Sequence, residues 1–316
     1  ADGSYSYVAN HNDADALDVG DSANDVFNYT ISDGNGGTDI ATITIVILGA
    51  NDSPVAVNDT DAVNEDATIT ESSGSELLIA DDTDADDSSS LKVTTIRPTG
   101  SSLTSVATSS TYNSNFTTVT GTYGTLKIGA DGSYTYVADQ DAADVLDAGD
   151  TVTESFTYTV SDNTWFGTGT LIITVTGIND APVAQNDVGV IVENGTLTVA
   201  NSANANVAGS YDATGEHTGD VIHTSLSGSK DTDVDGDDTA NLVVSAVRVG
   251  GTEGSGTTGT LGQALSGTYG ALTLNANGSY SYVASDDISG LRSGQTVTDV
   301  FNYTVSDGTA TDIATI

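Results

Sequence analysis

Three near-copies of one eight-residue segment recur along the chain, and this repetition limits the folds that the sequence can adopt. The segment Asp-Gly-Ser-Tyr-Ser-Tyr-Val-Ala at residues 2–9 returns at 131–138 and 277–284, after spacings of 129 and 146 residues. A second segment, Phe-Asn-Tyr-Thr-Ile-Ser-Asp-Gly at residues 27–34, returns in the same order after each copy of the first. Internal similarity of this kind is typical of tandem modules. The sequence therefore predicts an array of similar units.

Two linkers divide this array into three parts. Ile47–Ala56 and Val175–Ala184 each run from an apolar strand into Gly, then Asn-Asp, then a small residue and Pro-Val. Because proline lacks an N–H and fixes its own φ, it ends strand pairing and favours an extended residue before it. The predicted modules are residues 1–49, the C-terminal part of one repeat; residues 50–178, a complete repeat; and residues 179–316, a third repeat that lacks most of its last strand.

Within a module, apolar and polar residues alternate. In residues 170–176, Leu171, Ile173 and Val175 share one face, and the other face is mostly Thr. Half-buried antiparallel strands have this pattern. The Asp-Gly pair at residues 131–132 favours a hairpin turn between two such strands. Frequent turn signals between short strands predict an all-β chain of tandem β-sandwich modules in an extended array.

The chain is strongly acidic. It has 45 Asp and Glu against 6 Lys and Arg, which gives a formal net charge of −39. A surface of this charge repels nucleic acid and anionic membranes, so we expect neither as a partner and no insertion into a membrane. The sequence has no Cys, so no disulfide is expected, and its abundance of Thr, Ser, Gly and Asp favours a cell-surface or secreted protein.

Oxygen-bearing side chains gather at three places around each linker: the Asn-Asp pair of the linker, a Glu just inside the next module, and an Asp-rich cluster. Calcium takes six to eight hard oxygen ligands, and alternate Asp residues can wrap one ion. Solvated turns would explain one such loop, but the recurrence of all three elements at both linkers favours calcium. The predicted Ca²⁺ ligands are Asn51, Asp52, Glu65, Asp82, Asp84 and Asp86 around the first linker, and Asn179, Asp180, Glu193, Asp231, Asp233, Asp235 and Asp237 around the second.

A further acidic segment, Asp141–Asp150, is predicted to form a single helical turn anchored by Leu146, with no role in binding calcium. Its counterparts are Asp13–Asp21 and Asp286–Gly294. The third copy does not keep the acidic residues of the second, since Arg292 or Leu291 stands opposite Asp147. Solvated surface is therefore the preferred interpretation of this turn.

No catalytic constellation is evident. His11, His217 and His223 have no Cys and no recurrent Ser or acidic partner, and their spacing is not that of a zinc site. We therefore do not expect an enzyme. The Trp165-Phe166 pair is either a ligand platform or a local packing contact, and packing is the favoured interpretation.

Taken as a set, the segments 121–137, 146–149, 156–162 and 175–183 closely resemble the VCBS-type repeat of very large bacterial surface and secreted proteins, including RTX-type adhesins. The linkers are also similar to those of cadherin-like modules, in which an Asn-Asp-x-Pro linker, an N-terminal Glu and an Asp-x-Asp loop share calcium between domains. This resemblance implies Ig-like or cadherin-like sandwiches. It assigns Asp52, Glu65, Asp82 and Asp84 to the first joint, and Asp180, Glu193, Asp231 and Asp233 to the second.

These observations predict the stalk or fibre body of an extracellular adhesin or surface filament, stiffened by calcium, with a role in cell adhesion and biofilm. Its partners would be neighbouring repeats of the same chain and identical chains in a fibre. The alternative is a calcium-dependent carbohydrate-binding module for surface glycans, supported by Trp165-Phe166 and by the insertion Tyr211–Lys230 in the third repeat. The incomplete outer repeats predict a window cut from a longer repetitive fibre, with strand exchange between subunits as the alternative.

Overall fold

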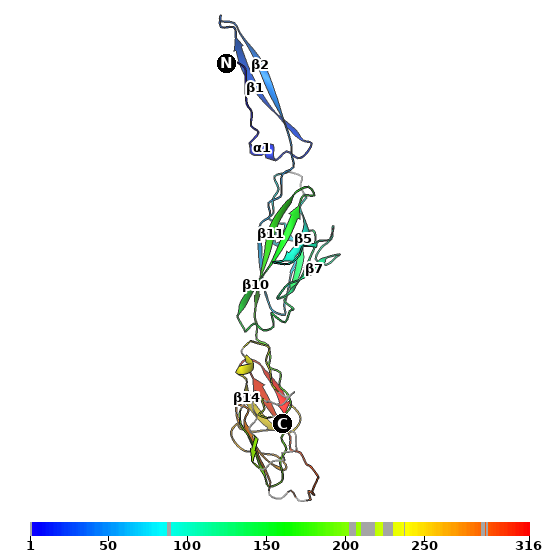
Figure 1. Cartoon of the computed structure of the whole chain (residues 1–316), viewed down its shortest axis with the longest axis vertical. Helices are drawn as coiled ribbons and strands as arrows, with labels where there is room; N and C mark the ends of the chain where they lie inside the picture. The colour runs from blue at the N-terminus through cyan, green and yellow to red at the C-terminus, as the bar shows by residue number, and fades with distance from the viewer. Residues whose placement is uncertain are drawn as a thin grey trace. The chain divides into compact units, whose positions relative to one another are not determined.

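The computed structural model describes residues 2–86, 90–201, 207–209, 219–223, 230–236, 238–285, 288 and 290–316. They form two compact units, one of Ala1–Ala143 with Thr151–Thr176 and one of Asp144–Asp150 with Gly177–Ile316. Almost every regular element is a β-strand (Figure 1), so the predicted all-β sandwich fold is confirmed. Within the described residues, no helix has both the length and the apolar character needed to cross a membrane.

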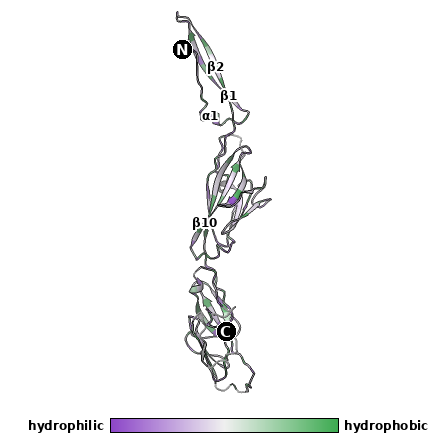
Figure 2. Cartoon of the chain, in the orientation of Figure 1, coloured by the Kyte–Doolittle hydropathy of each residue, from purple (hydrophilic) through white to green (hydrophobic). Residues whose placement is uncertain are grey.

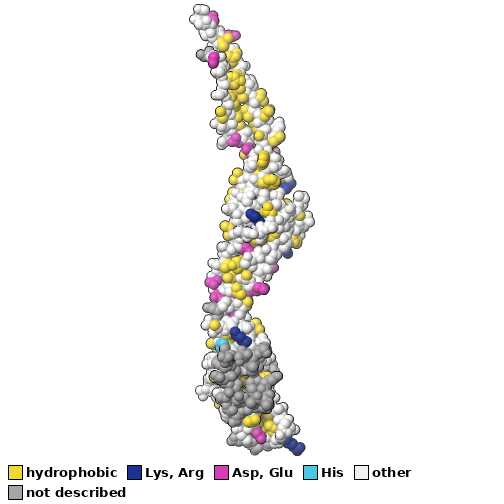
Figure 3. Space-filling model, viewed as in Figure 1, with side chains coloured by type: hydrophobic (Ala, Val, Ile, Leu, Met, Phe, Trp, Pro, Cys, Tyr) yellow, Lys and Arg dark blue, Asp and Glu magenta, His cyan; other side chains and the backbone are white. Residues whose placement is uncertain are grey.

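The first 49 residues form one antiparallel hairpin preceded by a short helix. The helix α1 spans Asn12–Asp15, and the hairpin pairs β1 (Ser22–Ser32) with β2 (Thr38–Leu48). Two strands cannot enclose a core, so the hairpin leaves apolar side chains exposed (yellow in Figure 3). Phe27 and Tyr29, for example, are 48% and 49% exposed.

The second module is a complete two-sheet sandwich. One sheet has the order β3-β11-β10-β5-β6 and the other β4-β9-β8-β7. β3 runs parallel to β11, and the other neighbours are antiparallel. The strands are β3 (Asp59–Asn64), β4 (Thr68–Glu71), β5 (Lys92–Pro98), β6 (Thr104–Ser105), β7 (Thr117–Thr120), β8 (Thr125–Ile128), β9 (Tyr134–Val137), β10 (Thr151–Ser161) and β11 (Phe166–Thr176), with a 3₁₀ turn, η1, at Gly74–Glu76.

The core of this module lies between the two sheets, and the period-two pattern determines which side chains enter it. Leu171, Ile173 and Val175 are fully buried, as their alternation predicts. Tyr136 and Phe156 meet edge to face across the sheets, with ring centroids 6.0 Å apart. Hydrophobic residues (green) lie along the strands of the hairpin and of both sandwiches in Figure 2.

The third module repeats this plan with sheets β13-β12-β18-β17-β16 and β15-β14-β19-β20. Most of the insertion predicted at Tyr211–Lys230, including His217, lies outside the described residues. The elements are β12 (Thr196–Val199), β13 (Val207–Gly209), β14 (Val243–Val249), β15 (Thr257–Thr258), β16 (Leu265–Ser266), β17 (Gly270–Leu274), β18 (Tyr280–Ala284), β19 (Phe301–Ser306) and β20 (Thr311–Thr315), with a 3₁₀ turn, η2, at Asp238–Ala240.

A buried tyrosine fixes the start of each complete module to its core. The Tyr158 hydroxyl lies 2.6 Å from the Val57 carbonyl oxygen and 2.9 Å from Asp59 Oδ2. In the third module, the Tyr303 hydroxyl lies 2.8 Å from the Gln185 carbonyl oxygen and 2.6 Å from Asp187 Oδ2. The chain that leaves each linker is therefore anchored to the sandwich within a few residues.

Candidate metal centres

The first linker is attached to the second module by a short ladder. The Val55 N–H donates to the Thr83 carbonyl at 2.7 Å, and the Thr83 N–H donates back at 3.0 Å. This pairing places the Asp-rich loop beside the Asn-Asp pair of the linker, since the Asp52 N–H donates to Asp86 Oδ2 at 3.0 Å. A ladder of two residues thus determines which acidic side chains of the loop meet the linker.

Three carboxylates converge at this place. Asp84, Asp86 and Asp162 each offer an oxygen, and these oxygens lie within 4.8 Å of one another. Asp162 comes from the turn between β10 and β11, far away in sequence, and Asn51 Nδ2 donates to its Oδ2 at 2.6 Å. Asp84 Oδ2 and Asp86 Oδ1 are buried without a hydrogen-bond partner among the described residues. Buried carboxylate oxygens that lack donors are suitable ligands for a cation.

The hairpin module also contributes to this cluster. Asp18 follows Leu17 in the loop after α1, and its carboxylate is close enough to oppose ionisation of Asp86. Gly49 makes this approach possible, because a Cβ there would collide with the carbonyl oxygens of Leu17 and Asp18. The glycine of the linker is thus required by the close packing of the preceding loop.

The cluster is unfavourable as a set of bare negative charges. Burial raises the pKa of Asp86, and the neighbouring Asp84, Asp52 and Asp18 carboxylates raise it further, although the Asp52 N–H opposes the shift. Burial also acts against ionisation of Asp162, but hydrogen bonds from Asn51 and from backbone N–H groups outweigh it and lower the pKa of that carboxyl. Among the described residues, Asp84, Asp86 and Asp162 have no Lys or Arg partner. A divalent cation would supply the missing positive charge.

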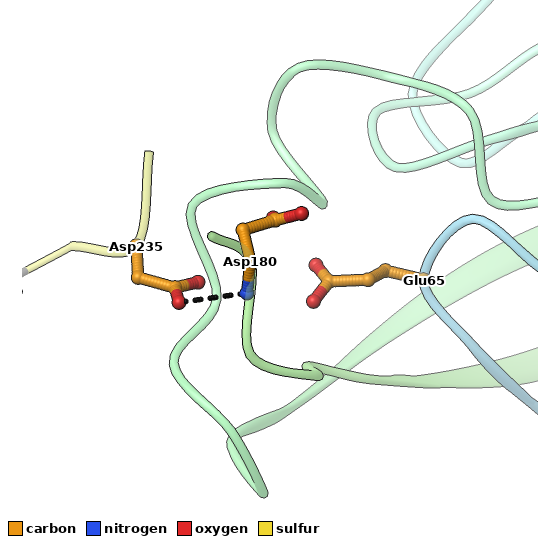
Figure 4. A group of neighbouring side chains, drawn as sticks. All are labelled: Glu65, Asp180 and Asp235. Carbon is orange, nitrogen blue, oxygen red and sulfur yellow. Dashed lines mark hydrogen bonds between the residues drawn. The ribbon is translucent and has the colours of Figure 1, made fainter. Parts of the chain in front are cut away.

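The same arrangement recurs at the second linker. The Val183 N–H donates to the Thr232 carbonyl at 2.7 Å. The Asp180 N–H donates to Asp235 Oδ2 at 3.0 Å (Figure 4). Asn179 Nδ2 donates to Asp307 Oδ2 at 3.1 Å.

Three carboxylates also converge at the second linker. Asp233, Asp238 and Asp307 offer oxygens within 4.8 Å of one another. Asp233 Oδ2 and Asp235 Oδ1 are buried and have no hydrogen-bond partner in the part of the chain that the structure describes. Burial raises the pKa of Asp233 and that of Asp235. Both linkers therefore gather three carboxylates, although Asp238 takes the third place at the second linker, where the first has Asp86.

Asp147 also belongs to this second cluster. A Cβ on Gly236 would lie 3.5 Å from Asp147 Oδ1, and that oxygen is buried without a hydrogen-bond partner among the described residues. A Cβ on Gly177 would collide with the carbonyl oxygens of Leu146 and Asp147, which repeats the packing of Gly49. We interpreted the acidic turn as solvated surface, but each of its first two copies places one carboxylate at a linker. Asp18 lies at the first linker and Asp147 at the second. The exposed Arg292 occupies the equivalent position in the third module.

The structure separates the predicted ligands into groups. Asn51, Asp52, Asp84 and Asp86 meet at the first linker, and Asn179, Asp180, Asp233 and Asp235 meet at the second. Asp82 and Asp231 lie apart from these clusters: each accepts a hydrogen bond at 2.7 Å from a backbone N–H just after the linker, those of Val57 and Gln185. Asp237 lies outside the described residues.

The assignment of Glu65 to the first joint is not supported by its position. Glu65 follows β3, and its N–H donates to the Thr176 carbonyl at 2.9 Å. Since β3 and β11 are parallel, this places Glu65 at the end of the module opposite to Asp52 and Asp84. Glu193 occupies the equivalent place in the third module and borders a cavity there.

Sequence reasoning missed Asp18, Asp147, Asp162, Asp238 and Asp307. The signal for Asp162 and Asp307 was present, because both follow Ser in the recurrent Phe-x-Tyr-Thr-Val-Ser-Asp segment. The signal for Asp18 and Asp147 was hidden by Arg292 in the third copy.

Comparison with known proteins identifies the type of module. Residues 51–177 and 179–316 each match the bacterial cadherin-like domain, and residues 1–46 match the bacterial Ig domain. The calcium-binding lectin RapA2 of Rhizobium johnstonii is 32% identical over 179 residues, which cover 56% of this chain and 69% of that protein.

Two solved structures are also similar. Drosophila N-cadherin EC1-4 is 12% identical with a TM-score of 0.29, over 96% of this chain and 60% of that one. The protocadherin GammaB4 extracellular domain is 10% identical with a TM-score of 0.37, over 93% of this chain and 38% of that one. The chain thus spans less than two thirds of either structure. Because the cadherin-like matches cover most of its length, the chain belongs to the bacterial cadherin-like domain family.

Proposed function

We propose that this chain is part of the stalk or fibre body of an extracellular adhesin or surface filament, and that calcium bound at its joints stiffens it. Cadherin-like and Ig-like domains are typically non-enzymatic structural or adhesion modules, and the family match supports an adhesin-like repeat region. The more specific VCBS-type character and a location at the cell surface or in the medium are parts of the same proposal.

The observation that carries the calcium proposal is the cluster at the first linker. It combines one carboxylate from the hairpin module, Asp18, with Asp84, Asp86 and Asp162 from the sandwich and Asp52 from the linker between them. An ion held there would join two modules and neutralise charges that otherwise repel each other. The proposed ligands at the second linker are Asp147, Asp180, Asp233, Asp235, Asp238 and Asp307, while Glu65 and Glu193 remain predicted ligands.

The test is to measure calcium binding and chain dimensions together. Isothermal titration should show calcium binding that Asp84→Ala weakens at least tenfold, while Asp141→Ala, an exposed change in the acidic turn, leaves it unaltered. Small-angle scattering should report a shorter and more flexible chain after EDTA treatment. Scattering profiles that do not change with EDTA, or equal effects of the two variants on affinity, would refute the proposal.

A second function is favoured by one surface feature. Trp165 and Phe166 are 53% and 63% exposed at the turn between β10 and β11, and aromatic faces of this kind stack on sugars. The lectin similarity adds support for a carbohydrate ligand among surface glycans. A glycan array probed with the chain would decide: calcium-dependent binding that is lost in Trp165→Ala supports this function, and no binding argues against it.

A further inference from the structure

A group of buried carboxylates lies inside the third module. Asp187, Asp220 and Asp231 are 5%, 0% and 0% exposed. The carboxylates of Asp187 and Asp220, and that of Asp312 in β20, all lie close enough to Asp231 to oppose its ionisation. We call these four residues the inner carboxylate group. The group shares no member with the cluster at the second linker.

The Tyr303 hydroxyl beside this group is surrounded by more acceptors than it can serve. It lies 2.6 Å from Asp187 Oδ2, 2.8 Å from the Gln185 carbonyl oxygen and 3.1 Å from the Val221 carbonyl oxygen. A phenol has one proton to donate, so the hydroxyl can satisfy only one of these three oxygens at a time. Oxygen atoms thus gather here in excess of the protons that this hydroxyl brings.

Asp231 adds a buried oxygen that lacks a donor. Its Oδ1 accepts the Gln185 N–H at 2.7 Å, and its own N–H donates to the Ile222 carbonyl at 3.2 Å. Oδ2 of the same carboxylate is buried and has no hydrogen-bond partner in the part of the chain that the structure describes. Among the same residues, no Lys or Arg forms an ion pair with Asp231. A fully buried carboxylate in this situation is unfavourable unless a proton or a cation compensates it.

A similar but more open arrangement occurs in the second module. The Tyr158 hydroxyl lies 2.9 Å from Asp59 Oδ2 and 3.0 Å from the Leu78 carbonyl oxygen. Asp82 Oδ1 accepts the Val57 N–H at 2.7 Å, while Asp82 Oδ2 is buried without a hydrogen-bond partner among the described residues. Asp59 and Asp82 are only partly buried. The third module therefore has the more enclosed version of the two.

We propose that the inner carboxylate group binds a calcium ion, and that this ion is distinct from any ion at the linker. Its ligands are Asp231 Oδ2, the Asp187 carboxylate and the carbonyl oxygens of Gln185 and Val221. Calcium takes six to eight hard oxygens in flexible geometries, whereas Mg²⁺ retains several waters, which suits a buried site less well. Tyr303 is a positioning residue, since its hydroxyl orients the Asp187 carboxylate.

Such an ion would fasten the chain that leaves the linker to the core of the module. It binds whether or not the joints also bind calcium.

The first test counts the calcium ions bound by the intact 316-residue chain in equilibrium dialysis at neutral pH. Asp231→Asn keeps the shape and the Oδ1 acceptor but removes the charge, and it should weaken the binding of one ion at least tenfold. Asp187→Asn should have the same effect, and the double variant should lose that one ion only, because the two residues share it. Each variant removes a buried negative charge, so neither should lower the unfolding midpoint in EDTA.

Asp299→Asn is the matched control. The Asp299 carboxylate also accepts backbone N–H groups and a tyrosine hydroxyl, those of Thr268, Tyr269 and Tyr282. It lies outside the inner carboxylate group, so this variant should bind calcium as the parent chain does. A loss of calcium as large as that in Asp231→Asn would overturn the proposal.

A combined variant separates this site from the linker. If Asp231→Asn and Asp233→Asn affect different ions, their losses should add in the double variant. Loss of one and the same ion in both would place Asp231 at the joint and overturn the proposal. If Asp233→Asn loses no ion and Asp231→Asn does, the joint proposal fails and this one stands.

Terbium provides a second readout that needs no acidic variant. Tb³⁺ replaces Ca²⁺ at oxygen sites, and a nearby tyrosine sensitises its emission. Tyr303→Phe should therefore lower the emission, whereas Tyr282→Phe, which removes the hydroxyl that donates to Asp299 at 2.6 Å, should not. An unchanged calcium number in Asp231→Asn, or terbium emission unaffected by Tyr303→Phe, would indicate that protons alone compensate the group and would overturn the proposal.

Discussion

Replacing Asp86 by Asn should have opposite effects in the absence and presence of calcium. Asp86 is 9% exposed, its Oδ2 accepts the Asp52 N–H, and its Oδ1 has no hydrogen-bond partner among the described residues. Asn keeps the shape and one acceptor oxygen but removes the charge. Without calcium the variant should be more stable than the parent chain. On addition of calcium, its stability should increase by less than that of the parent chain.

The magnitude follows from the spacing of the carboxylates. At the 4.8 Å limit that encloses the oxygens of Asp84, Asp86 and Asp162, two unit charges at an effective dielectric constant of ~20 repel by about 3.5 kcal/mol. Asp84 and Asp162 are partly exposed, so solvent screening reduces this to about 1–2 kcal/mol. Loss of one charged ligand that weakens calcium binding 10- to 100-fold corresponds to about 1.4–2.8 kcal/mol of lost stabilisation.

Thermal unfolding followed by Trp165 fluorescence is a suitable assay, because the backbone N–H of Trp165 donates to Asp162 Oδ1 at 2.7 Å, which places the residue beside the cluster. One kcal/mol should shift the midpoint by about 3–5 °C for a module of this size. The calcium-free Asp86→Asn chain should therefore unfold a few degrees above the parent. Its unfolding midpoint should rise less on addition of calcium than the midpoint of the parent does. Asp141→Asn is the matched control and should match the parent in both conditions. A variant that unfolds earlier than the parent without calcium would refute the electrostatic reasoning.

Three further predictions concern other parts of the molecule. Burial raises the pKa of Asp59 to about 7, so the native state keeps a proton that the unfolded chain releases near pH 4. The calcium-free chain should therefore lose stability as the pH rises from about 4 to 7. The difference between its unfolding midpoints at pH 5 and pH 8 should be smaller in Asp59→Asn than in the parent chain. Asp147→Ala should weaken calcium binding at the second linker at least tenfold and Asp144→Ala should not, as titration calorimetry would measure; equal effects would remove Asp147 from the site. Gly49→Ala should displace Asp18 and weaken calcium binding at the first linker, while the Trp165-reported midpoint in EDTA stays unchanged; unaltered affinity would contradict this role of the glycine.

The sandwich could be predicted from the sequence because its signals are local. Alternation placed Leu171, Ile173 and Val175 on one face, and the structure buries all three. The Asp-Gly pair at residues 131–132 marked a turn, and Gly132 there adopts a positive φ of 82° between β8 and β9. Short-range periodicity and turn chemistry need no knowledge of the partner strand.

The candidate metal centres could be predicted only in part because their residues meet through tertiary structure. Asp84 and Asp86 share a loop, so their spacing alone indicated a site. Asp162 reaches the same place only because β10 carries it back to the linker. Glu65 is close to Asp52 in sequence, yet the six residues of β3 carry it to the other end of the module. Proximity along the chain was misleading where a strand intervened.

The residue after the anchor leucine differs between the modules. Asp18 and Asp147 present a carboxylate to the module that follows each of them in this chain, whereas the third module presents Arg292 at that position. If the second and third modules were exchanged by recombination, Arg292 would face an Asp-rich loop in place of a carboxylate. Its guanidinium would pair with one acidic oxygen and compete with the calcium ion proposed for the joint. If the joints bind calcium as proposed, an Asp→Arg change at Asp18 or Asp147 would convert an ion-dependent joint into an ion-independent one.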